Sequence, residues 1–349
     1  MLQTDELIQK LSSTGSLEEN EYAQLIKDYS EENAERLKAL ADAKRREIYG
    51  NEIFIRGLIE VSNICKNDCI YCGIRRSNRN CDRYRLTPEE ILACANNGYE
   101  LGFRTFVMQG GEDPFFTDEV LESIIKEIKS RHPDCAVTLS MGERSDESYQ
   151  RLFDAGADRY LLRHETASKI HYEKLHPQEM SFENRMRCLR ELRRIGYQVG
   201  CGFMVGSPYQ TENELAKDLK FIEEFRPDMC GIGPFIPHKD TPFRDEAAGT
   251  AELTCYLLSI IRLIYPRILL PATTALGTAD GMGREKGILA GANVIMPNLS
   301  PVSVRAKYEL YDNKICTGEE AAECVNCLKG RITRIGFKIV TDRGDIRKE

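Results

Sequence analysis

Short apolar runs alternate with longer amphipathic segments along most of the chain. Eight apolar runs of strand length follow one another, at residues 53–61, 105–109, 136–140, 159–165, 199–205, 229–235, 268–274 and 292–297. The segments between them repeat apolar residues at helical spacing. Several begin with a threonine followed three residues later by a glutamate, such as Thr87 with Glu90 and Thr211 with Glu214. This pattern is the capping box that starts a helix.

Strand–helix alternation repeated eight times predicts an α/β protein built on a parallel (β/α)8 barrel of the TIM type. Residues 1–48 are rich in Glu, Lys, Leu and Ala at helical spacing. We therefore expect an N-terminal helical extension over residues 1–50, the barrel over 51–311, and a C-terminal appendage over 312–349. In this fold catalytic groups gather at the carboxyl ends of the strands, so polar residues there are expected to carry the chemistry.

Composition and charge exclude several classes of partner. The chain has 349 residues, 42% of them hydrophobic, and a formal net charge of -7. No basic block points to nucleic acid, and no apolar stretch reaches the ~20 residues that span a bilayer. The N-terminal residues lack the basic start and apolar run of a signal peptide. We expect a cytoplasmic protein that binds neither nucleic acid nor membrane.

Thirteen cysteines are many for a chain of this kind, and clustered thiols in a reducing compartment indicate metal or redox chemistry. Cys65, Cys69 and Cys72 follow the first predicted strand with the spacing C-x3-C-x2-C. Thiolates suit iron–sulfur clusters or zinc. A structural zinc site would need a fourth ligand close by, and Cys81 comes only nine residues later. Three ligands on a 4Fe–4S cluster would leave one iron open; a zinc knuckle or three incidental thiols are the alternatives.

Polar groups follow the second and fourth predicted strands. The stretch MQGGEDP covers residues 108–114, and its paired glycines allow the backbone to approach a ligand closely. Arg163 and Glu165 are alternate residues of a strand, so both are predicted to face the barrel lumen. Buried charges need a partner. The pair is therefore either a structural ion pair or a site for an ionic ligand, and Arg185 in SFENR is a further candidate.

The last two strands and the region after them add further candidates. Thr273 and Thr274 end the seventh run with hydroxyl and backbone donors that suit an anion, and Met296 in the eighth either lines the cavity or packs in the core. A second cysteine group follows with the spacing C-x7-C-x2-C, at Cys316, Cys324 and Cys327. It is either a second metal site or a reduced surface group prone to oxidation.

The first cysteine motif, with Tyr71 just before its last cysteine, resembles that of the radical S-adenosylmethionine (SAM) enzymes. The stretches RHETA, GIGPFIPH, PATTALGT and GANVIMPN make the chain similar, from about residue 50 to residue 330, to the HydE family of FeFe-hydrogenase maturases. Methylornithine synthase and biotin synthase are related to that family. The chain lacks the extra cluster ligands expected of biotin synthase.

The resemblance implies a set of roles. Cys65, Cys69 and Cys72 are the expected ligands of a catalytic 4Fe–4S cluster whose open iron binds SAM, and reductive cleavage would give a 5′-deoxyadenosyl radical. The residues expected to bind SAM are Gly110, Gly111, Glu112, Ser140, Glu165 and Arg185. Those expected to contact the substrate are Gln109, Thr138, Arg163, Thr273, Thr274, Met296 and Tyr308. The second cysteine group, Cys316, Cys324 and Cys327, would hold a 2Fe–2S or 4Fe–4S cluster.

The resemblance also implies a substrate and partners. The expected substrate is a small iron complex that carries CO, cyanide and a cysteine-derived ligand. The expected partners are the other hydrogenase maturases and a reductant such as ferredoxin or flavodoxin. Two other functions remain open: a radical SAM mutase of amino-acid metabolism, similar to methylornithine synthase, and an iron–sulfur scaffold without catalytic activity.

Overall fold

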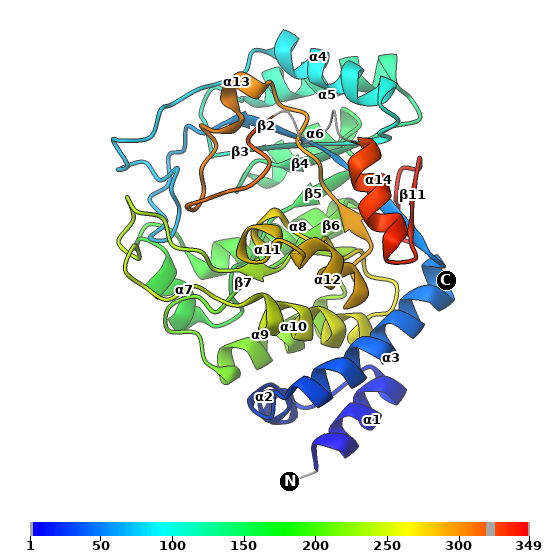
Figure 1. Ribbon diagram of the computed structural model, residues 1–349. Helices are drawn as coiled ribbons and strands as arrows, with labels where there is room; N and C mark the ends of the chain where they lie inside the picture. Colours follow the sequence, from blue (N-terminus) through cyan, green and yellow to red (C-terminus); the bar gives the residue numbers. More distant parts are fainter. Residues whose placement is uncertain (1–2, 319–324, 348–349) are drawn as a thin grey trace.

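A closed barrel of eight parallel segments forms the centre of the computed structural model, which describes residues 3–318 and 325–347. Six strands make one continuous parallel sheet (Figure 1), in the order β2 (Gly57–Ser62), β3 (Thr105–Gly110), β4 (Ala136–Ser140), β5 (Arg159–Leu161), β6 (Gln198–Cys201) and β8 (Met229–Cys230). Their side chains are mostly buried, as in sheets covered on both faces.

Two short segments close the ring between β8 and β2. Residues 268–271 form bridges from Leu269 to Met229 and from Pro271 to Val294 of β10 (Val294–Ile295), and Asn298 forms a bridge to Leu58 of β2. All three bridges are parallel. Each of the eight predicted runs therefore contributes one wall of the barrel, and the expected (β/α)8 fold is confirmed.

Helices cover the outside of the barrel and follow the strands in chain order (Figure 1). Their bounds are α4 (Pro88–Glu100), α5 (Asp118–Arg131), α6 (Asp146–Asp154), α7 (Lys169–Leu175), α8 (Phe182–Ile195), α9 (Glu212–Phe225), α10 (Ala251–Ile264), α11 (Thr274–Ala279), α12 (Gly283–Leu289) and α13 (Val302–Arg305). The capping boxes predicted at Thr87 and Thr211 are both formed. A two-stranded parallel pair, β7 (Met204–Val205) with β9 (Gly233–Pro234), extends the barrel at its carboxyl end.

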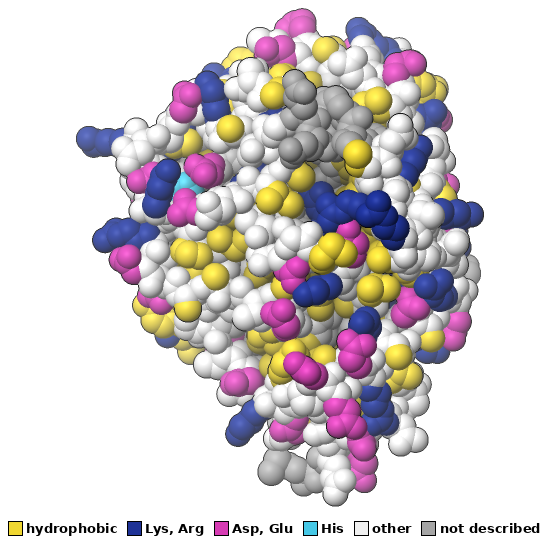
Figure 2. Space-filling model, viewed as in Figure 1, with side chains coloured by type: hydrophobic (Ala, Val, Ile, Leu, Met, Phe, Trp, Pro, Cys, Tyr) yellow, Lys and Arg dark blue, Asp and Glu magenta, His cyan; other side chains and the backbone are white. Residues whose placement is uncertain are grey.

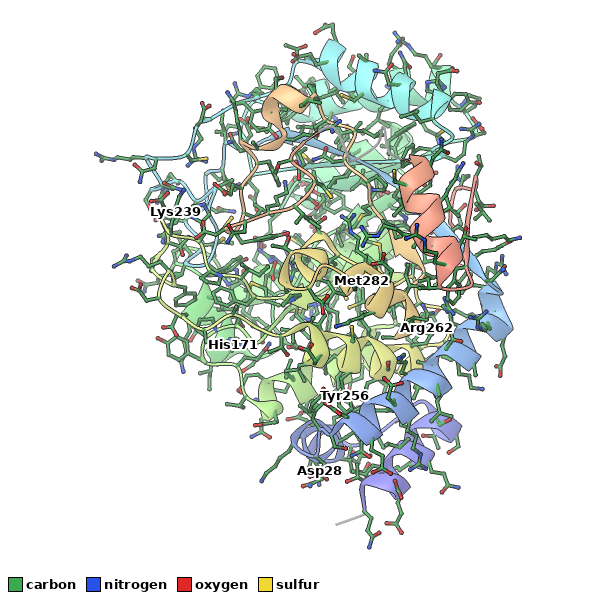
Figure 3. All side chains as sticks on the ribbon, viewed as in Figure 1. Asp28, His171, Lys239, Tyr256, Arg262 and Met282 are labelled. Atoms are coloured by element: carbon green, nitrogen blue, oxygen red, sulfur yellow. The ribbon has the colours of Figure 1, made fainter. Side chains whose placement is uncertain are left out.

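The N-terminal extension is helical, as the sequence indicates, and consists of α1 (Thr4–Thr14), α2 (Glu19–Lys27) and α3 (Glu31–Tyr49). It packs on α9 and α10 at the lower edge of the view in Figure 1. The Tyr256 hydroxyl of α10 donates to Leu25 O of α2 (2.8 Å) and so links the extension to the barrel helices (Figure 3). Arg262, further along α10, instead donates to Gly291 O within the barrel domain. The extension thus packs on helices of the barrel and lies away from the carboxyl ends of the strands.

The C-terminal segment closes the amino end of the barrel. After α14 (Val325–Arg334), strand β11 (Lys338–Val340) pairs in parallel with β1 (Glu52–Ile55). Residues 343–345 then enter the floor: Arg343 O accepts from Arg159 Nη2 (2.9 Å), Gly344 O accepts from Arg56 Nη2 (3.1 Å), and Asp345 pairs with Arg159. Only the carboxyl end of the lumen remains for a site.

The surface carries both signs of charge. Figure 2 shows Lys and Arg side chains interspersed with Asp and Glu over the face in view. Among the described helices there is none whose length and apolar character would let it cross a membrane.

Candidate active site

A cavity of about 290 Å³ lies at the carboxyl end of the barrel. Its walls come from the cysteine loop (residues 65–73), the ends of β3, β4, β5 and β9, and a segment after the eighth barrel strand, residues 306–316, which we call the strap. The predicted site residues that line it are Cys65, Cys69, Cys72, Gln109, Gly110, Gly111, Glu112, Ser140, Arg163, Glu165, Arg185, Thr273 and Tyr308. The top-face rule therefore brings most of the candidates together.

The three thiols of the cysteine loop share one wall of this cavity, and among the described residues that line it no other thiol occurs. Burial raises the pKa of all three, that of Cys72 to about 12. Neighbouring thiols raise the pKa of Cys69 further, and all three residues line the same cavity. A buried thiol loses its proton when it binds a metal. Three soft ligands in one wall suit an iron–sulfur cluster.

One arginine holds the shape of the cysteine loop from behind. The Arg83 guanidinium donates to three backbone carbonyls of the segment after Cys72, those of Ile74 (2.8 Å), Arg75 (2.6 Å) and Asn78 (3.0 Å). Arg75 in turn pairs with Asp68 inside the loop (2.8 Å). The chain around the thiols is therefore fixed by side chains that do not line the cavity.

The Gly-Gly-Glu stretch packs directly against the cysteine loop. A Cβ at Gly111 would lie 2.3 Å from Ile64 O and 2.8 Å from Cys65 Cβ, so only glycine fits there. Glu112 N donates to Cys65 Sγ (3.4 Å), and Lys66 N donates to Glu112 O (3.1 Å). The close approach that the paired glycines predict is thus an approach to the cysteine loop, and it sets Glu112 beside Cys65.

Arg163 and Glu165 face each other in the lumen, with Arg163 Nη2 3.2 Å from Glu165 Oε2. Hydrogen-bond geometry is not met, and Arg163 Nε, Arg163 Nη2 and Glu165 Oε2 are buried without a hydrogen-bond partner. Unpaired buried polar atoms are costly. The pair therefore fits a ligand that offers an acceptor to the guanidinium and a donor to the carboxylate.

Arg185 reaches the same cavity from the start of α8. Its Nε donates to Glu143 Oε1 (2.6 Å), and its Nη1 donates to Arg163 O (2.5 Å). Glu143 N also donates to Glu112 Oε1 (3.1 Å). These bonds connect Arg185, the Gly-Gly-Glu stretch and the fourth predicted strand end around one space. A ligand bound there would contact both a cationic and an anionic group.

Three predicted substrate residues do not line the cavity. Thr138 lies deeper in the lumen, in a small cavity beside Arg56 and Arg159. The Thr274 hydroxyl accepts from Arg284 Nη2 (3.4 Å), and Met296 packs against a core cluster. The resemblance that implied a role for Thr138 identifies a position on β4 but not the depth of its side chain in the lumen.

The second cysteine group is described only in part. Cys316 Sγ accepts from Arg284 Nη2 (3.4 Å), and Cys327 lies on α14. Cys324 is outside the described residues. A second cluster on Cys316, Cys324 and Cys327 stays a prediction.

Met180 and Glu143 are two residues in or beside the cavity that were not predicted: Met180 lines it, and Glu143 lines the neighbouring groove and bonds to Arg185. Glu143 follows β4 and could have been found by the strand-end rule, since it lies just past Ser140. Met180, whose Sδ is 3.7 Å from Cys69 Sγ, lies in a loop with no sequence signal. Met180 and Glu112 also line a neighbouring groove of about 740 Å³ at the starts of α5, α6 and α8. The cavity is therefore separated from this groove by a few side chains.

Comparison with known proteins gives consistent relatives. Residues 59–222 match the radical SAM superfamily. The chain is 48% identical over 310 residues to the FeFe-hydrogenase maturase subunit HydE of Thermotoga maritima, covering 89% of this chain and 88% of the relative. It is 29% identical over 338 residues to 3-methylornithine synthase of Methanosarcina barkeri, covering 96% and 93%.

Solved structures agree on the fold. Methylornithine synthase (PylB) superposes with a TM-score of 0.83 at 25% identity, covering 96% of this chain and 97% of that one. The FeFe-hydrogenase maturase HydG superposes with a TM-score of 0.80 at 23% identity, covering 97% and 76%. The likeness to HydG shows the fold alone.

Proposed function

Because the chain belongs to the radical SAM superfamily and, within it, to the HydE family of FeFe-hydrogenase maturases, we propose that it cleaves SAM reductively and acts on a small iron complex during assembly of the hydrogenase active-site cluster. The complex carries CO, cyanide and a cysteine-derived ligand. Other maturases supply and receive it, and a ferredoxin or flavodoxin provides the electron.

The residues present fit the cluster and the cofactor. Cys65, Cys69 and Cys72 would hold a 4Fe–4S cluster, since three soft ligands share one wall and no fourth thiol lines the described cavity. When bound, the cluster and SAM supply a one-electron cleavage that yields a 5′-deoxyadenosyl radical. The chain's own groups bind, orient and shield these components.

One observation carries the proposal: the unpaired atoms of Arg163 and Glu165 lie in the same cavity as the three thiols. A ligand with both an amino and a carboxylate group, such as the methionine end of SAM, supplies the partners that these atoms lack. Arg185, held by Glu143, adds a second cation for a carboxylate. A scaffold that only carries iron has no need for such a pair.

The test uses anaerobically reconstituted protein with SAM and dithionite. We expect 5′-deoxyadenosine in chromatography, and none from the Cys69→Ala variant. A second assay adds the chain to hydrogenase apo-protein with the other maturases and measures hydrogen evolution. Full activation of the hydrogenase without this chain would refute the maturation role, and absence of SAM cleavage would favour the scaffold.

A mutase of amino-acid metabolism is the second candidate, because the chain is similar to 3-methylornithine synthase over 96% of its length. Incubation of the reconstituted protein with SAM, dithionite and L-lysine separates the two. Formation of methylornithine would favour the mutase, and SAM cleavage without that product would favour the maturase.

A further inference from the structure

The strap, residues 306–316, crosses the mouth of the cavity between the cysteine loop and the loop after β9. Tyr308, Leu310 and Tyr311 line the cavity from it. Gly73 N donates to Leu310 O (2.8 Å), and a Cβ at Gly73 would lie 2.2 Å from Glu309 O. The strap therefore lies directly against the residue that follows Cys72 and forms part of the wall of the cavity that holds the thiols.

One buried ion pair ties the strap to the barrel wall. Lys314 Nζ donates to Glu60 Oε1 on β2 (2.5 Å) and to Tyr308 O (2.7 Å), and the two side chains are only 7% and 2% exposed. Glu60 Oε2 also accepts from Asn298 Nδ2 (2.8 Å). Lys314 thus joins the two ends of the turn 308–314 to the barrel.

The same pair directs Tyr308 into the cavity. Glu60 is the register partner of Gln109 on β3, and Gln109 Nε2 lies 3.5 Å from the Tyr308 hydroxyl. Lys314 Nζ lies 4.9 Å from the centre of the Tyr308 ring. The phenol therefore projects beside Gln109 because its backbone carbonyl and its ring are both held by Lys314.

The outer edge of the strap is linked to the loop after β9. His238 Nε2 lies 3.7 Å from Glu309 Oε2 and 3.9 Å from Asp312 Oδ1, while His238 Nδ1 accepts from Asp240 N (3.1 Å). That bond places the ring proton on Nε2, which points at the two carboxylates. A metal ion would need the lone pair of the same nitrogen. The group is therefore a link that holds the strap, and Lys239 N, from the residue labelled in Figure 3, adds a bond to Asp312 (2.9 Å).

We propose that Lys314 and Glu60 are positioning residues for the reaction: they hold the strap closed over the cavity and set the Tyr308 phenol, so that the cluster and SAM are shielded from water. The inference rests on the proposed function. A buried charge without its partner is costly, so loss of either residue opens the strap. Exclusion of water strengthens the ionic contacts within the site.

The test compares two variants with a matched control on the same strap. Lys314→Met keeps the aliphatic stem but removes the charge, and Glu60→Gln with Lys314→Met removes both charges together. Lys307→Met is the control, since Lys307 lies on the outer side of the strap and pairs with the exposed Asp82 (2.8 Å). Such surface pairs contribute little.

Hydrogen exchange of the strap amides is the first readout, and it needs no cluster. We expect exchange about tenfold faster in Lys314→Met and in the double variant, and unchanged in Lys307→Met. The double variant should unfold in urea near the wild-type midpoint, because no buried charge is left unpaired. Wild-type exchange in either Lys314 variant would overturn the proposal, since the pair would then only stabilise the fold.

Release of iron to a chelator from reconstituted protein with SAM is the second readout. We expect release about tenfold faster in the double variant than in wild type, with equal iron content at the start. Equal rates would overturn the shielding role. If wild type itself fails to assemble a cluster, the proposed function fails, while the exchange measurement still decides whether the pair holds the strap.

Discussion

Gly111→Ala tests whether the Gly-Gly-Glu stretch places the cysteine loop. The added Cβ would lie 2.3 Å from Ile64 O, 2.8 Å from Cys65 Cβ and 2.9 Å from Ile64 C. Carbon atoms in contact prefer ~3.5 Å or more, so the loop must move by roughly 1 Å. Backbone atoms cannot give way as the end of a flexible side chain does. Overpacking of this kind costs about 1–3 kcal/mol, which lowers cluster affinity by roughly 5- to 150-fold.

Two other glycines make a graded series. A Cβ at Gly110 would lie 3.1 Å from Val61 Cγ2 and 3.3 Å from Ser62 O, which is tight but close to ordinary contact. Gly281 has nothing within 4 Å of its added Cβ. We expect a severe effect of alanine at Gly111, a mild one at Gly110 and none at Gly281. Neither steric bulk in general nor loss of glycine flexibility would produce this order.

The assay is anaerobic reconstitution followed by a count of iron and sulfide per chain and by electron paramagnetic resonance of the reduced protein with and without SAM. Urea unfolding of the apo-protein, measured in parallel, separates loss of the cluster from loss of the fold. Should Gly111→Ala assemble the same cluster as Gly281→Ala, the contact between this stretch and the cysteine loop would not position the thiols, and our reasoning about the site would be wrong.

Three further predictions concern the thiols, the barrel floor and a helix start. Cys69→Ala should abolish 5′-deoxyadenosine formation while Cys324→Ala leaves most of it, and equal loss would show that both cysteine groups are needed. Asp345→Asn removes the carboxylate that pairs with Arg159, a side chain that is 4% exposed. We expect the free energy of unfolding in urea to fall by about 3 kcal/mol. This is the lower end of the range for breaking a buried ion pair, because Asp345 itself is 39% exposed. Burial opposes ionisation of Asp345, but Arg159, Arg343 and Gln198 together outweigh it and lower the pKa of Asp345. Wild type should therefore lose this contribution as the pH falls below ~4, the usual pKa of an aspartate, whereas the variant should change less over the same range. Thr87→Ala should destabilise by about 1 kcal/mol in thermal unfolding and Thr87→Ser by much less, since the hydroxyl accepts from Glu90 N.

The barrel is predictable because parallel strands covered on both faces must be apolar on both faces. Each wall therefore has a continuous run such as Ala136–Ser140, and the helix that follows it often starts with a visible cap. The closure of the floor was not predictable. Residues 342–345 have no apolar run and no periodic pattern. Arg56 and Arg159 hold them in the barrel floor through hydrogen bonds, and the sequence alone does not show that these two arginines are buried.

The site was predictable where its residues come directly after a strand, because the carboxyl ends of the barrel strands meet at one face. Alternation along a strand predicted Arg163 and Glu165 on one face, but β5 ends at Leu161 and Glu165 has a φ of 65°. The two side chains do lie 3.2 Å apart, yet loop geometry and not strand alternation brings them together. The family resemblance implied a substrate role for Thr138, which is on the same strand as Ser140 but lies deeper in the lumen.

Met180 lines the cavity and Glu143 lies beside it, bonded to Arg185. Both residues are in loops, where neither strand or helix periodicity nor helix capping predicts the direction of a side chain. Loop geometry depends on partners distant in the sequence, and one sequence does not display them.

Both ends of the lumen are completed by chain that follows the eighth barrel strand. The strap closes the carboxyl end through Lys314 and Glu60, and residues 343–345 close the amino end through Arg159. Without these segments Glu60 and Arg159 would lose the oppositely charged side chains Lys314 and Asp345. Where a relative shares the barrel but has a different sequence after the eighth strand, we expect it to differ more in which molecules can enter the cavity than in how the thiols are held. Selectivity for the substrate should therefore follow the strap, while SAM cleavage follows the cysteine loop.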